Sequence, residues 1–292
     1  MRDIDDLDRT PLDQGAAQQT AERRQQSPRE TEPRAELSRE PQAITGRTYA
    51  YCLSPAELET MREIGRFRTV AIDDLARIRY HDNAGQMRQD LPALADQGLI
   101  QCRTAWTRAN REKLAVAVLT ERGKEVLDRH FSQGSSQQLY AGFVKPAEVA
   151  HDAAIYRMYQ AEAGRIVASG GRIRRVVLDY ELKQKVYSPL AKAKAKSLGT
   201  AEYAKRQTEV AGQNGLVVIH GKIPLPDLRI EYETAEGESG RVDLELATHH
   251  YHGSHLQTKA EAGFKMYAPA DSVGRLTAVL EDREITAAIL SL

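Results

Sequence analysis

The chain has 292 residues, of which 41% are hydrophobic and 28% charged, and its formal net charge is zero. This length corresponds to about two domains of ~150 residues each, and the composition supports a buried core in a soluble protein. Because no global charge attracts the chain to DNA or to a membrane, any nucleic-acid binding must come from local patches.

The two cysteines, Cys52 and Cys102, lie far apart and without the spacing of metal ligands. We therefore expect neither a disulfide framework nor a zinc site, and the reducing cytoplasm is the expected location. No apolar run approaches the ~18 residues of a membrane span, so no membrane partner is expected. The N-terminal sequence MRDIDDLDRT lacks a hydrophobic signal region, and secretion is not expected.

Residues 1–46 are rich in Gln, Arg, Glu, Asp and Pro and contain almost no aromatic residues. Such a segment cannot bury enough apolar surface to offset the entropy lost on ordering. We predict a disordered tail, which is either a solvated leader or an arm that binds a partner.

Three helices are predicted at the start of the next segment, residues 47–132. Ser54–Pro55 supplies an N-cap and a first helical residue, and apolar residues follow at helical spacing. The sequences AIDDLARIRY and DNAGQMRQDLPALADQGLI predict the second and third helices, the latter with Gly98 as its C-cap. Pro92 lies inside the third helix and is expected to kink or divide it.

A β-hairpin and a closing helix complete this segment. Two strands, 100–105 and 113–119, are joined by the basic sequence WTRANRE, and Thr120 caps the helix ERGKEVLDRHF. This order of elements is the winged-helix arrangement, and DQGLIQCR followed by VAVLTERGKEVLDR resembles the winged-helix regulators. The resemblance implies a DNA-binding domain over residues 47–132.

A winged helix places its recognition helix in the major groove, and its wing reaches the flanking backbone or the minor groove. The candidate DNA-binding residues are Asn83, Gln86, Arg88 and Gln89 on the third helix, and Arg103, Trp106, Arg108, Asn110, Arg111 and Lys113 on the wing. Winged helices also bind proteins, and Asp82, Asp90 and Asp96 line the supposed reading helix. The basic wing with its tryptophan is the stronger indication, and double-stranded DNA is the expected partner.

The remaining chain predicts a linker and an α/β domain, so the whole protein is of the α+β class. Residues 133–145 are a Ser-, Gln- and Gly-rich connection, and residues 146–292 form the domain. In turn we expect a helix ending at Gly164, a strand through 176–178, and a Lys-rich helical region with a break near Gly199. A strand in GLVVIHGKI, a β-hairpin, a helix over SHLQTKAEAGFKMYA, one more helix and a final strand follow.

Apolar and charged residues alternate along both strands of this hairpin, between residues 226 and 247. Side chains alternate between the two faces, so both apolar sets share one face only if paired residue numbers sum to an even value. The turn then holds an odd number of residues, either 237–239 or 235–239, and contains a glycine. The same register places Asp227, Arg229, Glu231, Asp243 and Glu245 together on the opposite face.

This polar face has two interpretations. If it is solvated, Arg229 and Arg241 neutralise the acids across the strands. If helices cover it, the crowded carboxylates are costly without a cation. Asp227, Asp243 and Glu245 are then the ligands of a divalent ion such as Mg²⁺, which activates water against a phosphodiester.

Pro-Asp, a spacer and an acid-x-acid strand followed by a helix resemble the PD-(D/E)xK nuclease superfamily. More closely, HDAAIYRMY, LPDLRIEYE, VDLELATHH and HLQTKAEAGFKMYAP after a winged helix resemble the replication-relaxation family. That family comprises proteins of plasmids and integrative elements that are implicated in conjugation and replication, and the resemblance covers residues 50 to about 270. The residues it implies are the acids Asp227, Asp243 and Glu245, together with His151, Lys259 and Tyr267.

The sequence departs from the nuclease motif in one respect. The motif has a lysine two residues after the second acid, but position 247 is Ala and position 245 is Glu. Lys259, on the following helix, is the remaining lysine candidate, so the catalytic set is Asp227, Asp243, Glu245 and Lys259. This departure favours a degenerate nuclease-like domain that binds without cutting.

Two clusters give weaker indications. His249, His250, His252 and His255 suggest a transition-metal site, but without a second ligand motif a structural or phosphate-contacting role is preferred. The sequence AKAKAKS spreads Lys192, Lys194 and Lys196 around a helix, as a solvated face or as a phosphate-contacting strip with Lys183, Lys185 and Lys205.

The preferred hypothesis is a DNA-binding protein of a plasmid or integrative mobile element that acts in replication or conjugative DNA processing. A relaxase, a replication protein or a second copy of the chain is then a partner. One alternative is a Mg²⁺-dependent DNA endonuclease or nickase. The other is a winged-helix transcriptional regulator whose second domain senses a ligand or oligomerises.

Overall fold

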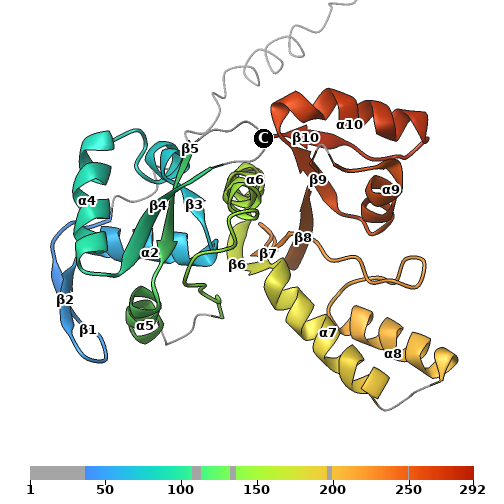
Figure 1. Cartoon of the computed structure of the whole chain (residues 1–292), viewed down its shortest axis with the longest axis horizontal. Coiled ribbons are helices and arrows are strands. Elements are labelled where there is room, and N and C mark those ends of the chain that lie inside the picture. Colours follow the sequence, from blue (N-terminus) through green and yellow to red (C-terminus); the bar gives the residue numbers. More distant parts are fainter. Residues whose placement is uncertain (1–36, 107–112, 132–135, 196–198, 249) are drawn as a thin grey trace, which may run out of the picture. The chain divides into compact units, whose positions relative to one another are not determined.

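Three sheets organise the part of the chain that the computed structural model describes, which is residues 37–292 apart from 107–112, 132–135, 196–198 and 249 (Figure 1). They have two, three and five strands, and helices connect them. The architecture is therefore mixed α+β, as expected. None of the helices in these residues has both the length and the apolar character that crossing a membrane requires.

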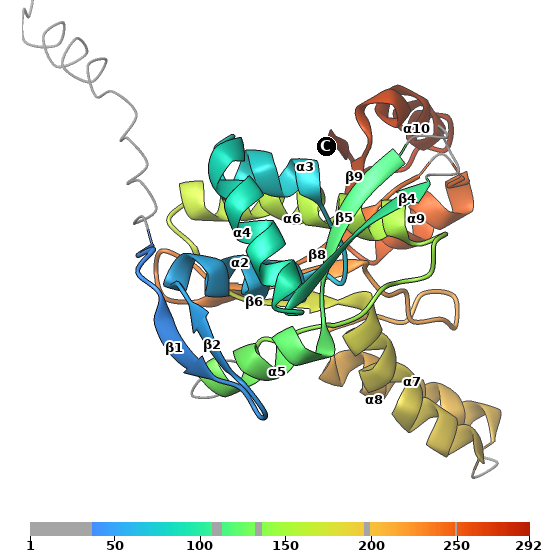
Figure 2. The same ribbon diagram turned by 60° about the vertical axis from the view of Figure 1, so that its left-hand side comes forward.

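The N-terminal elements form the two smaller sheets and the helices around them. They are β1 (Gln42–Thr45), β2 (Ala50–Leu53), α2 (Pro55–Arg66), β3 (Val70–Ala71), α3 (Ile72–Asp74), the π-helical η1 (Leu75–Arg79), α4 (Ala84–Asp96), β4 (Ile100–Trp106), β5 (Lys113–Leu119) and α5 (Glu121–His130). β1 and β2 pair with each other, and β3, β5 and β4 form an antiparallel sheet in that order. β1 also packs beside α5 (Figure 2).

Local signals in the sequence explain where these helices begin. The Ser54 hydroxyl accepts a hydrogen bond from the Glu57 amide at 3.2 Å, and the Glu57 carboxylate accepts one from the Ser54 amide at 2.8 Å. This capping box satisfies two amides that the helix itself leaves unpaired. Thr120 caps α5 through the Gly123 amide. The predicted helix starts at Ser54–Pro55 and Thr120 are confirmed.

One N-terminal prediction is wrong in its bounds, and one of the two effects expected of Pro92, a division of the third helix, is wrong. The predicted tail of residues 1–46 extends too far, because 42–45 form β1, where Ile44 is buried; residues 1–36 lie outside the described part of the chain. Pro92 does not divide the third helix, since α4 continues through it to Asp96. The carbonyl left without a donor belongs to Arg88, an exposed residue where water can satisfy it.

The C-terminal elements build the five-stranded sheet and its helical layers. They are α6 (Val149–Ala168), β6 (Arg172–Leu178), α7 (Asp179–Ala195), α8 (Thr200–Gln213), β7 (Leu228–Glu233), β8 (Ser239–Leu246), α9 (Gly253–Glu261), β9 (Lys265–Ala268), α10 (Ala270–Asp282) and β10 (Ile289–Ser291). The strand order is β10-β9-β8-β7-β6, with β8, β9 and β10 parallel and the other pairs antiparallel. α6 packs on β6, β7 and β8, whereas α9 and α10 pack on Met266 and Ala268 of β9.

Four C-terminal predictions need correction. α6 continues through Gly164 to Ala168, and GLVVIHGKI contains one isolated bridge, Ile219 with Lys222, instead of a strand. The expected helix over 254–268 ends at Glu261, because Gly263 at φ +77° reverses the chain into β9. The β7–β8 turn is neither 237–239 nor 235–239 but the five residues 234–238.

The N-terminal elements and the large sheet share one hydrophobic core. Phe67 at the end of α2 packs edge-to-face on Tyr156 of α6, with ring centroids 5.1 Å apart. The Tyr156 hydroxyl and the Gln160 amide donate to the buried Glu63 carboxylate at 2.5 and 2.8 Å. Residues 37–292 accordingly form one compact unit.

Part of the predicted linker, 133–145, belongs to this unit. Leu139 and Val144 are buried, and the Tyr140 amide donates to the Gly65 carbonyl at 2.7 Å. The Gln137 side chain bonds both the amide and the carbonyl of Val176, at the edge of the sheet. The described residues of this segment are therefore packed against the protein on both sides of the expected boundary.

Candidate functional site

The first candidate surface is the β4–β5 ribbon, which carries the described part of the predicted wing. Arg103, Trp106 and Lys113 are exposed, and Trp106 has 63% of its surface accessible. Trp106 and Lys113 face each other across the strands, with the ammonium 5.3 Å from the indole ring centre. The Arg103 guanidinium lies 4.1 Å over the Phe143 ring. β4 and β5 contain no acidic residue, so their described surface carries only positive charge.

Three predicted wing residues, Arg108, Asn110 and Arg111, lie outside the described part of the chain.

On α4, the predicted reading helix, the four candidate residues behave differently. Arg88 and Gln89 are exposed. Asn83 caps the helix by accepting from the Gln86 amide at 3.1 Å. The Gln86 side chain donates to Asp90 at 2.6 Å. Arg88 and Gln89 are thus available to a ligand, whereas Asn83 and Gln86 already stabilise the helix.

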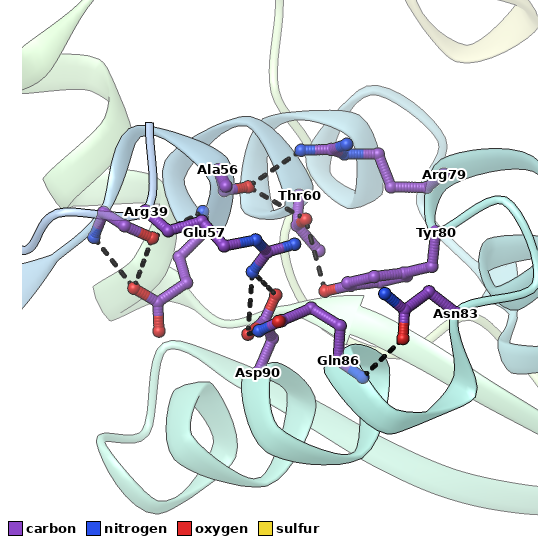
Figure 3. A network of polar contacts seen from close by, with 10 residues as sticks. Arg39, Ala56, Glu57, Thr60, Arg79, Tyr80, Asn83, Gln86 and Asp90 are labelled. Atoms are coloured by element: carbon purple, nitrogen blue, oxygen red, sulfur yellow. Dashed lines mark hydrogen bonds and ion pairs between the residues drawn. The ribbon is translucent and has the colours of Figure 1, made fainter. Parts of the chain in front are cut away.

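Asp90 is turned inward, between Arg39 and Gln86 (Figure 3). It is 5% exposed, and its carboxylate lies 3.1 Å from the Arg39 guanidinium. A buried and paired carboxylate does not face a phosphate backbone on the outer side of the helix. Of the three acids that the sequence places on this helix, Asp82 and Asp96 remain exposed, close to its two ends.

The second candidate site lies where β7 begins and β8 ends. Leu228 pairs with Leu244 and Arg229 with Asp243, so paired residue numbers sum to an even value, as predicted. Extending this register by one residue brings Asp227 opposite Glu245. The Asp227 carboxylate accepts a hydrogen bond from the Leu246 amide at 2.9 Å. The sheet therefore holds these two acids side by side.

Asp243, the third predicted acid, is committed to Arg229. The Arg229 Nε and Nη2 atoms donate to the two Asp243 oxygens at 2.6 and 2.8 Å, a bidentate pair. Arg229 also donates to the carbonyls of Asn214 and Gly215, at the end of α8. The arginine is 5% exposed. The part of the polar face around Arg229 is thus covered, as in one interpretation, and neutralised by arginine, as in the other, whereas Arg241 is exposed.

Glu245 is the most deeply buried acid of the site, with 1% of its surface exposed. Its Oε1 atom accepts from the Tyr251 hydroxyl at 2.5 Å and lies 2.7 Å from the Lys259 ammonium, which also donates to the Leu225 carbonyl. Its Oε2 atom is buried without a hydrogen-bond partner. Burial raises the pKa of Glu245 to about 7, and the charge of Asp227 adds to the shift.

His151, near the start of α6, contacts Asp227. Its Nε2 atom lies 3.5 Å from Asp227 Oδ2, and its Nδ1 atom lies 3.6 Å from Asp152. Burial opposes the charged imidazole, but the two carboxylates outweigh it and raise the pKa of His151 to about 10. Burial likewise opposes the charged Asp227, yet the hydrogen bond from His151 keeps its pKa below the usual value. The site therefore contains a His151–Asp227 ion pair.

These carboxylates fit the predicted Mg²⁺ site only in part. The unpartnered Oε2 of Glu245 next to Asp227 is a feature that a cation could satisfy. Asp243, however, would have to leave Arg229 to become a third ligand. Among the described residues, no cluster of three or more His, Cys, Asp or Glu side chains is arranged to hold a metal ion. The set of Asp227, Asp243 and Glu245 is therefore not assembled as a common ligand sphere.

Next to Glu245 lies a pocket of about 840 Å³. Its walls come from α7, α8, α9, the turn before β7 and the segment before α9. Its aromatic and basic lining side chains are Tyr187 of α7, Tyr203 of α8, Lys222 of the turn, and His250, Tyr251, His255 and Lys259. Tyr251 and Lys259, which bind the Glu245 carboxylate, line this pocket as well. The buried acid thus lies directly behind the pocket wall.

The structure brings together some of the residues that sequence reasoning proposed and separates others. Asp227, Glu245, Lys259 and His151 converge, whereas Tyr267 donates to Glu162 at 2.5 Å on the α6 side of the sheet. The lysines of α7 are partly paired: Lys183 with Asp179, and Lys185 with Glu181. His250 and His255 line the pocket, and His252 is exposed at the start of α9; His249 lies outside the described chain.

Sequence reasoning missed Tyr187, Tyr203, Lys222 and Tyr251. They come from four separate segments of the chain, and only Tyr251, inside the histidine cluster of residues 249–255, lies within a motif. Only the pairing of α7 with α8, side by side in Figure 1, and the return of the chain past α9 bring them together.

Comparisons with protein-family models, with curated proteins and with solved structures produced no match to this chain.

Proposed function

We propose that the protein binds double-stranded DNA through α4 and the β4–β5 ribbon, which act as the recognition helix and wing of a winged helix. The observation that carries this proposal is the ribbon: Arg103, Trp106 and Lys113 are exposed on strands that contain no acid. Cations of this kind neutralise phosphates and release counterions, which supplies most non-specific DNA affinity.

The reading helix supports the same proposal. Arg88 and Gln89 are exposed, and Asp90 is withdrawn into a pair with Arg39. An exposed arginine and an amide are the side chains that read guanine and adenine edges in the major groove. The sequence resemblance to the replication-relaxation family supports a place in replication or conjugative DNA processing of a plasmid or integrative element.

The test replaces Arg88, Arg103 and Lys113 together by Ala. We expect weaker binding to duplex DNA, and a slope of log affinity against log salt reduced by about two units, because the phosphate contacts of Arg103 and Lys113 are lost while Arg88 contacts a base edge. Fluorescence anisotropy with a labelled duplex at several salt concentrations measures both. The matched control is Lys124→Ala, which removes a cation from α5 that pairs with Asp128. An unchanged slope in the triple variant would refute the proposal.

The proposal includes a nuclease-like C-terminal half that does not cut. Its support is the Pro226–Asp227 pair directly before β7 and the acid-x-acid pattern of β8, combined with the capture of Asp243 by Arg229. We expect supercoiled plasmid incubated with Mg²⁺ or Mn²⁺ to remain uncut by the wild type, as measured by gel electrophoresis. Nicking by the wild type that Asp227→Ala abolishes would instead show that the site is an active nuclease.

A further inference from the structure

We propose that the pocket beside Glu245 binds an unpaired nucleotide of single-stranded DNA. The inference extends the proposed DNA binding to a second site, and it uses none of the residues of the α4 and ribbon surface. Three properties of the pocket carry it: its charge, its aromatic side chains and its size.

The charge of the pocket fits an anion. Among its described lining residues there are two lysines and two histidines but neither Asp nor Glu. Lys259 is held 2.7 Å from the Glu245 carboxyl group, whereas Lys222 is exposed on the turn before β7. In a chain with equal numbers of acidic and basic residues, a lining without acids is a local departure from the average. Lys222 is therefore the expected contact of a phosphate.

The aromatic side chains fit a base. Tyr187 and Tyr203 line the pocket from two adjacent helices, and Tyr187 is 52% exposed although it is an aromatic residue. Tyr251, just before α9, and His255, within α9, also line the pocket, with ring centroids 5.9 Å apart. Aromatic rings around a positively charged groove are the platform on which unpaired bases stack, whatever their sequence.

The walls of the pocket are held by a small core of their own. Val186, Leu190, Val210, Ile223 and Phe264 pack together, and two of them, Leu190 and Ile223, also line the pocket. The pocket volume of about 840 Å³ lies within the range of small-molecule and cofactor sites. A duplex cannot present a base to such a pocket without unpairing it, so the ligand is a single strand.

The experiment measures binding of a fluorescein-labelled oligothymidylate of about 12 nucleotides, long enough to follow a positive groove. In the double variant Tyr187→Ala, Tyr203→Ala we expect affinity to fall by roughly 5- to 150-fold, the range for losing one stacked base. Lys222→Ala should reduce the salt slope by about 0.7. Tyr187→Phe keeps an aromatic ring and should bind like the wild type.

The matched control is Tyr180→Ala, which removes another exposed tyrosine of α7 that does not line the pocket. It should leave oligothymidylate affinity unchanged. Ultraviolet cross-linking of the oligothymidylate to the wild type, followed by mass spectrometry, should locate the contact in peptides containing Tyr187 or Tyr203. Wild-type affinity in the double variant, or cross-links confined to the β4–β5 ribbon, would overturn the inference.

Parallel measurements with a blunt duplex separate the two proposals. The Tyr187→Ala, Tyr203→Ala variant should keep its duplex affinity, and the Arg88→Ala, Arg103→Ala, Lys113→Ala variant should keep its single-strand affinity. Duplex binding without single-strand binding would refute the pocket alone. Single-strand binding without duplex binding would refute the winged-helix proposal and support the pocket.

Discussion

Replacing Arg229 by Met is expected to lower the free energy of unfolding by about 3–5 kcal/mol, because it breaks a buried ion pair from one side. Asp243 would lose both of its guanidinium hydrogen bonds while its side chain stays 12% exposed. The carbonyls of Asn214 and Gly215 would lose their donor at the same time. Urea denaturation followed by circular dichroism measures the change.

Two further variants identify the cause. Arg172→Met removes an arginine from the neighbouring strand whose side chain is 65% exposed, and should cost less than about 1 kcal/mol. Adding Asp243→Asn to Arg229→Met should recover part of the loss, because the uncompensated negative charge disappears. If Arg229→Met cost no more than Arg172→Met, the pair would not stabilise the sheet, and the covered face would need another explanation.

The geometry of this pair shows how far sequence alone could reach. The alternation of apolar and charged residues predicted the parity of the β7–β8 register correctly, because a shift by one residue would expose Leu228 and Leu244. It could not predict whether the polar face was covered. That depends on the end of α8, which reaches Arg229 through the carbonyls of Asn214 and Gly215.

Helix starts were predictable, but helix ends only in part: Gly98, at φ +69°, follows the end of α4 as expected. Ser54 and Thr120 cap through neighbours within three residues, so a short window contains the whole signal. In contrast, Gly164 did not end α6, while Gly263 followed the end of α9 and turned the chain into β9. β9 is defined by its parallel pairing with β8, a long-range contact that the apolar sequence FKMYA does not reveal.

The residues of the candidate site also include some that the sequence could predict and some that it could not. Asp227 and Glu245 could be predicted because they are held by one hairpin. Lys259 could be predicted because it lies on α9, the helix that follows the hairpin, and its ammonium group does contact Glu245. Tyr187 and Lys222 could not be predicted, since the pocket is assembled from segments that carry no shared pattern.

Glu245→Gln is expected to gain stability relative to the wild type by about 3 kcal/mol as pH rises from about 4.5 to about 7. Burial and the charge of Asp227 raise the pKa of Glu245 in the folded protein from 4.5 to about 7. Between these values the folded wild type holds a proton that the unfolded chain releases. Wild-type stability therefore falls with pH over this range, whereas glutamine does not titrate.

Urea denaturation of both proteins at several pH values measures this difference, and contributions from groups common to both proteins largely cancel. Glu238→Gln, at an exposed position of the β7–β8 turn, is the control, and its difference from the wild type should stay flat. A Glu245→Gln difference that falls as pH rises would mean that the ion pair with Lys259, at 2.7 Å, outweighs burial. Glu245 would then be a permanently charged partner of Lys259, and the wall of the pocket would hold a fixed ion pair. We infer instead that Glu245 binds a proton near neutral pH.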